Sequence, residues 1–74
     1  MRAGDAISDI LEGQGRSQRS LAKQLDIAPQ TLSRRLLGDG SLRVDTLATM
    51  VEALGYRVVI EPISGDGITY EIDR

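Results

Sequence analysis

Apolar residues recur every three to four positions over the first three quarters of the chain, the spacing that is typical of amphipathic α-helices. This pattern predicts four helices, over residues 3–13, 18–25, 29–37 and 44–54. The apolar positions that set the spacing are Ile7, Ile10, Leu11, Leu21, Ala22, Leu25, Leu32, Leu36, Val44, Leu47, Ala48, Val51 and Leu54.

Helix boundaries are marked by residues whose backbone or side chain suits a terminus. Gly13 and Gly15 are expected to end the first helix, because glycine tolerates the left-handed conformation that follows many helices. Ser17 is placed to cap the second helix, and Pro29 suits the first position of the third. Gly55 is expected to stop the fourth helix.

The period changes after the fourth helix. Residues 56–63 are rich in β-branched side chains, 64–67 have turn composition, and alternating apolar residues follow. The expected fold is therefore mainly α, with four helices and a C-terminal β-hairpin. We expect one domain over residues 1–74, with a helical core over 1–55 and the hairpin as an extension over 56–74.

Composition excludes several classes of function. The chain has 74 residues with neither cysteine nor histidine, so disulfides, thiol nucleophiles, histidine-dependent triads and the usual zinc sites are ruled out. Asp5, Asp9 and Glu12 are spaced as a solvated helix face rather than a catalytic pair. We expect no catalytic residue, no metal and no cofactor. The longest aliphatic run, residues 58–60, is too short to cross a membrane, and we expect a soluble cytoplasmic protein.

The net charge of −2 would argue against a nucleic-acid partner, but it is an average over unlike segments. Residues 14–43 contain six basic and two acidic side chains, a net charge of +4. Residues 1–13 carry −2 and residues 44–74 carry −4. One continuous basic segment therefore lies within an otherwise acidic chain, either as an ordinary solvated surface or as a nucleic-acid contact.

The basic segment contains the second and third predicted helices, joined by only three residues, Asp26 to Ala28. Two short helices with such a turn must cross steeply, and Ala22 supplies the small side chain that a close crossing needs. This arrangement projects the second helix of the pair from the surface, in position to enter a DNA major groove.

The segment QRSLAKQLDIAPQTLSRRLLG resembles the lambda-repressor/Cro-like (Xre-type) helix-turn-helix family over roughly residues 3–55. The shared features are Gln-x-x-Leu-Ala, apolar residues around the turn, Leu-x-x-x-Leu before Gly38, and the helix VDTLATMVEALG. Two positions differ from the family: Asp26 stands where glycine is usual, and Arg35 where an apolar residue is common. Aspartate tolerates the left-handed conformation at some cost. An arginine stem can lie on the core while its head reaches a phosphate.

Base contacts are expected from the outer face of the third helix. Because Leu32 and Leu36 define its inward face, Gln30 and Arg34 point nearly the opposite way. Glutamine suits adenine and arginine suits guanine, and flanking Thr31 and Ser33 are further candidates.

Phosphate contacts are expected from the rim of this surface. The resemblance implies this role for Gln18 and Arg43, which match family positions. By position and chemistry the further candidates are Arg16, Arg19, Arg35 and Ser41.

The consecutive apolar residues of the first predicted strand suggest a second surface to cover, because a hairpin on a helical body buries only one face. The hairpin either caps the core of the monomer or forms a homodimer interface, and we favour the dimer because one short helix reads few bases. Two-fold symmetry predicts a pseudo-palindromic operator. The interface candidates are Val58, Val59, Ile60, Ile68 and Tyr70.

The sequence thus predicts a sequence-specific transcription regulator that binds double-stranded DNA, as a dimeric repressor that reads the major groove with residues 29–37. Two alternatives remain open. The chain could be an antitoxin that binds a toxin through its acidic, apolar C-terminal part, or a protein-interaction adaptor that keeps the fold without DNA binding.

Overall fold

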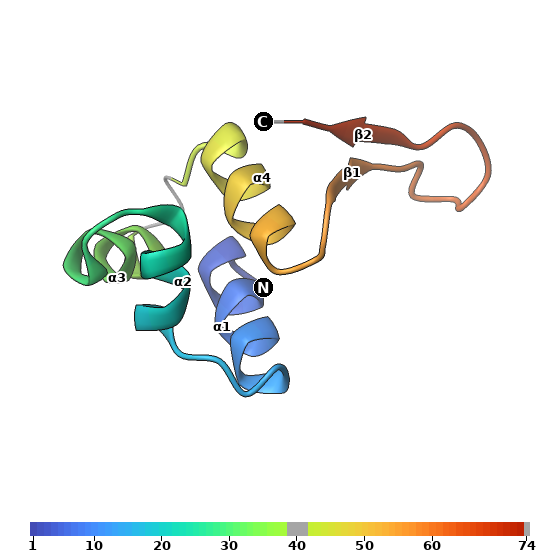
Figure 1. The fold of residues 1–74 in the computed structure, drawn as a ribbon. Coiled ribbons are helices and arrows are strands. Elements are labelled where there is room, and N and C mark those ends of the chain that lie inside the picture. The colour runs from blue at the N-terminus through green and yellow to red at the C-terminus, as the bar shows by residue number, and fades with distance from the viewer. Residues whose placement is uncertain (39–41, 74) are drawn as a thin grey trace.

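A computed structural model describes residues 1–38 and 42–73. The four helices are α1 (Ala3–Gly13), α2 (Gln18–Leu25), α3 (Pro29–Leu37) and α4 (Val44–Ala53). Two short strands follow, β1 (Val58–Ile60) and β2 (Tyr70–Ile72). The helices form one body, and the hairpin extends away from it (Figure 1). The mainly α fold with a C-terminal hairpin is confirmed.

The core lies between the four helices, where α1 and α2 each pack against both α3 and α4. Leucine, isoleucine and other aliphatic side chains fill it, because the chain has no Phe or Trp. Its buried members are Ile7, Leu11, Leu21, Ala22, Leu32, Leu36, Met50, Val51 and Leu54. Val58, the first residue of β1, packs on its edge, so the hairpin is anchored to the body at its base.

The pattern misplaced one residue of α4 and left out another. Val44 was expected on the buried face, but it is exposed because it opens the first turn of the helix, where the helical body ends. Met50 is buried, since it lies three residues after Leu47 and four before Leu54 on the inward face. Gly13 also differs from expectation: it is the last residue of α1, and the left-handed residue of that loop is Gly15 alone.

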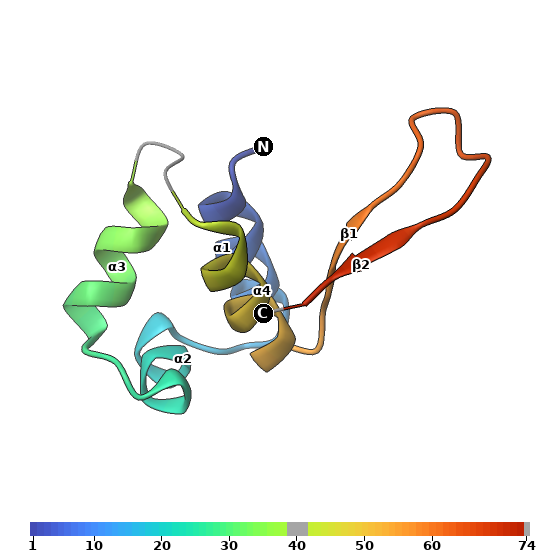
Figure 2. The ribbon, with the colours of Figure 1, turned by 90° about the horizontal axis from the view of Figure 1, so that it is seen from above.

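The turn between α2 and α3 has the expected form. Ser17 caps α2 by accepting a 3.1 Å hydrogen bond from the backbone N–H of Ser20. Asp26 ends α2 in the left-handed conformation, with φ 58° and ψ 45°, and Pro29 opens α3. This turn sets the direction of α3, which lies at the far side of the body from the hairpin in both views (Figures 1 and 2).

The two strands of the hairpin separate apolar from polar side chains more clearly than the apolar run 58–60 suggested. β1 and β2 pair antiparallel with Val58 opposite Ile72, Val59 opposite Glu71 and Ile60 opposite Tyr70. Because side chains alternate between the two faces of a strand, this register puts Val58, Ile60, Tyr70 and Ile72 on one face. Val59 shares the other face with Glu71, which forms a 3.7 Å ion pair with Arg57. The hairpin therefore has a single apolar face.

Residues 61–69 connect the strands without extending the ladder, so the first strand is shorter than the expected 56–63. Pro62 has no N–H to donate to a ladder, and its carbonyl accepts a 3.0 Å hydrogen bond from Gly65 in the turn. No helix of the described residues is long and apolar enough to cross a membrane. The same residues hold no group of three or more acidic side chains that could bind a metal.

A close approach between α1 and α3 predicts that one glycine substitution is destabilising. Gly4 on α1 lies against the backbone of Leu36 on α3, and a Cβ at this position would overlap the Leu36 carbonyl oxygen. We expect Gly4→Ala to lower the free energy of unfolding by about 1–3 kcal/mol, measured by urea unfolding followed by circular dichroism.

Gly13→Ala is the matched control, because open space surrounds Gly13. The control should be neutral or stabilising by up to about 1 kcal/mol, and equal effects of both changes would refute the close approach.

The left-handed residue in the α2–α3 turn gives a second prediction. Asp26→Gly should raise the free energy of unfolding by about 1 kcal/mol, because glycine adopts this conformation without the Cβ penalty. Asp26→Val should lower it by about 1–2 kcal/mol. Urea unfolding of the two variants beside the parent chain checks both signs. Destabilisation by glycine would contradict the observed turn.

Candidate nucleic-acid interface

The first part of the candidate interface is an open groove between the start of α2 and the outer face of α3. Gln18 and Arg19 occupy the first two positions of α2, where free backbone N–H groups and the helix dipole favour an anion. From α3, Gln30, Ser33 and Arg34 face the same groove. The full lining is Gln18, Arg19, Pro29, Gln30, Ser33, Arg34 and Leu37.

The second part is a groove between α3 and the start of α4, where Arg35 and Arg43 lie on opposite walls. Its lining is Arg34, Arg35, Gly38, Leu42, Arg43 and Thr46. Arg34 lines both grooves, so the two grooves together form one continuous surface, which we call the α3 surface. Among residues 1–38 and 42–73, four arginines and no carboxylate line it, and much of the basic charge of the sequence therefore lies there.

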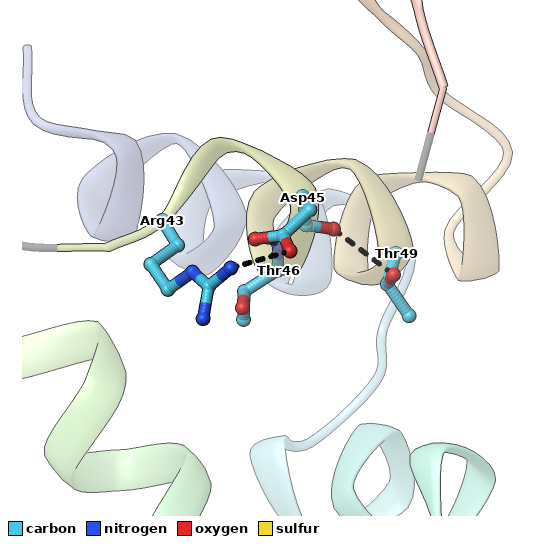
Figure 3. Close-up of polar contacts among 4 residues, drawn as sticks. All are labelled: Arg43, Asp45, Thr46 and Thr49. Carbon is cyan, nitrogen blue, oxygen red and sulfur yellow. Dashed lines mark hydrogen bonds and ion pairs between the residues drawn. The ribbon is translucent and has the colours of Figure 1, made fainter.

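Arg43 is held in place by a neighbour on α4. Its Nη2 donates to Oδ2 of Asp45 at 3.0 Å, while Oδ1 of Asp45 accepts a 2.8 Å hydrogen bond from the backbone N–H of Thr46 (Figure 3). The Arg43 side chain is 80% exposed. An exposed ion pair of this kind contributes only about 0–1 kcal/mol, so Arg43 can exchange the carboxylate for a phosphate at little cost.

The other arginines of the α3 surface are available to a ligand. Within residues 1–38 and 42–73, no ion pair to a carboxylate involves Arg19, Arg34 or Arg35. All three side chains are exposed. They therefore present unneutralised positive charge to the solvent.

Arg16 lies apart from this surface, although it belongs to the same basic segment. Its Nη2 donates to Oε1 of Gln24 at 2.6 Å and to Oγ of Ser20 at 3.4 Å. Gln24 in turn donates to the carbonyl oxygen of Ala53 at 3.2 Å. These contacts direct Arg16 along α2 toward the end of α4, and neither groove includes it.

Two of the candidates from the sequence remain, Thr31 and Ser41. Thr31 is half-buried and lines neither groove. Ser41 lies outside the described residues. Five groove residues were not among the candidates, namely Pro29, Leu37, Gly38, Leu42 and Thr46. Thr46 could have been found from its place in the first turn of α4, beside Arg43. Leu42 and Pro29 carry no polar signal that sequence reasoning could have used.

This arrangement, a steep helix pair whose second helix is flanked by basic and polar helix N-termini, is the geometry of a major-groove reader. The family model HTH_3, described as helix-turn-helix, matches residues 7–59. The chain belongs to the helix-turn-helix family. This confirms the Xre/lambda-repressor-like resemblance and identifies a protein of a DNA-binding transcription-regulator family. The match begins at residue 7 and ends at residue 59, within β1, whereas the resemblance covered roughly residues 3–55. No curated protein and no solved structure matched the chain.

Proposed function

We propose that this helix-turn-helix protein is a sequence-specific transcription regulator that binds an operator as a homodimer and represses by occluding a promoter. The observation that supports it is the α3 surface, where polar side chains of α3 lie between arginines on both sides. α3 enters the major groove, and the N-terminal turns of α2 and α4 lie beside it against the DNA backbone.

Within this proposal, the residues divide between two tasks. Gln30 and Arg34 read base edges, and Ser33 beside them adds a donor or acceptor. Gln18, Arg19, Arg35 and Arg43 contact phosphates, which fix the orientation of the protein on the duplex without reading sequence. The acidic remainder of the chain lowers non-specific attraction to DNA, so base contacts decide the choice of site.

The two tasks predict different behaviour of two arginine variants. With a site selected from random DNA, Arg34→Ala should lose about 1–3 kcal/mol of discrimination for that site over random duplex. Arg43→Ala should weaken binding to both duplexes alike and reduce the slope of log K against log salt by about 0.9. Titrations at several salt concentrations measure both quantities.

Arg57→Ala is the control of equal charge, because Arg57 lies on the hairpin and pairs with Glu71. It should leave both affinities nearly unchanged. If all three variants lose affinity equally on both duplexes, the assignment of Arg34 to base reading is wrong. If the parent chain shows no salt-dependent binding to any duplex, the chain is better explained as an adaptor.

The apolar face of the hairpin supports the dimer. Ile60 and Tyr70, opposite one another in the ladder, are each 58% exposed, because the hairpin extends past the helices that cover its base (Figure 2). This face carries no charge, so two copies can pack together without repulsion. The hairpin as a whole lies on the opposite side of the helical body from α3 (Figure 1), so a dimer formed through it leaves both recognition helices free. Ile68, two residues before β2 and also exposed, extends the apolar area.

The register also supplies a matched pair of variants for the dimer. Ile60→Glu puts a charge on the apolar face, whereas Val59→Glu puts the same charge on the polar face of the same strand. Light scattering should give a mass of about twice 8.0 kDa for the parent chain and for Val59→Glu, and the monomer mass for Ile60→Glu. A parent chain that is monomeric alone and purifies with an unrelated small protein would instead support the antitoxin.

A further inference from the structure

One exposed residue on the outer face of α3 has no role in the contacts proposed above. Leu37 lies seven residues after Gln30, four after Ser33 and three after Arg34, so it shares their face of the helix. It lines the same groove, together with the N-terminal residues of α2.

Leu37 does not contribute to the core. It is 75% exposed, whereas Leu32 and Leu36 on the inward face of the same helix are 0% and 8% exposed. A single exposed leucine needs no explanation by itself. This one, however, is the only aliphatic side chain other than that of Pro29 among the groove residues Gln18, Arg19, Pro29, Gln30, Ser33, Arg34 and Leu37.

The major groove of DNA offers one apolar group to such a side chain, the C5-methyl of a pyrimidine, which thymine carries. We propose that Leu37 is a specificity-determining residue that packs against the C5-methyl of a thymine in the operator. This inference rests on the proposed function, in which α3 occupies the major groove. It adds an apolar contact to the polar readout by Gln30 and Arg34, and it predicts a preference for thymine at the position next to those they read.

The test deletes the methyl group from the DNA and the apolar side chain from the protein. In the duplex selected by the full chain, each thymine of one half-site is replaced in turn by uracil, which lacks only the methyl. One replacement should weaken binding of the parent chain about fourfold, the amount expected for burying one carbon. The same replacement should change the affinity of Leu37→Ala by less than about twofold. Leu37→Met, which keeps a long apolar side chain, should retain most of the effect.

The results of these binding measurements separate failure of the inference from failure of the proposed function. If uracil weakens the parent chain and Leu37→Ala equally at every position, the inference is overturned while the proposed function stands, because the selected site is still bound. If uracil has no effect but 5-methylcytosine in place of cytosine strengthens binding of the parent chain alone, thymine is the wrong source of the methyl and the proposal fails. If no sequence is enriched by selection, the proposed function itself fails. Circular dichroism of Leu37→Ala should match the parent chain, since the side chain is exposed.

Discussion

The structure of the α3 surface depends on how α3 is anchored to the body. Only two side chains of this helix, Leu32 and Leu36, are buried, and they lie four residues apart on one line. With that line fixed against α1 and α2, the 3.6-residue period of the helix directs Gln30, Arg34 and Leu37 outward. Gly4 allows closer packing here, because a glycine has no Cβ and so lets α1 approach the backbone of α3 at Leu36. The same packing that stabilises the helix therefore orients the side chains that we propose contact DNA.

Charge is separated in space much as it is along the sequence. The described residues that line the grooves on either side of α3 include arginines and no carboxylate, and the hairpin at the opposite side of the body carries Glu61, Asp66, Glu71 and Asp73. A net charge of −2 is thus compatible with DNA binding. An acidic body weakens attraction to arbitrary phosphate, which leaves a larger share of the binding energy to base contacts.

Most of the helical body could be predicted from sequence, because its helices have regular apolar spacing and clear terminal residues such as Ser17, Pro29 and Gly55. Asp26 could also be placed, since aspartate is one of the few residues that tolerate the left-handed turn. The faces of the hairpin could not, because Val58, Val59 and Ile60 are all apolar. Only the pairing register shows that Tyr70 and Ile72 share a face with Ile60 and Val58, and that Glu71 lies beside Val59. Likewise, the sequence could not separate Arg16 from Arg19. Both are basic and near the start of α2, and only the long-range link through Gln24 to Ala53 directs Arg16 elsewhere.

The central claim is that the surface around α3, and not the hairpin, contacts DNA and does so with both flanking helix N-termini. An NMR titration of isotope-labelled full chain with its selected duplex tests this directly, because every backbone amide reports separately. We predict that the largest shift changes map to the starts of α2 and α4 and to the outer face of α3, around Gln18, Arg34 and Arg43, with Arg57 and Glu71 on the hairpin unaffected. Shift changes centred on the hairpin, or on α2 around Arg16 and Gln24 without α3, would contradict this account.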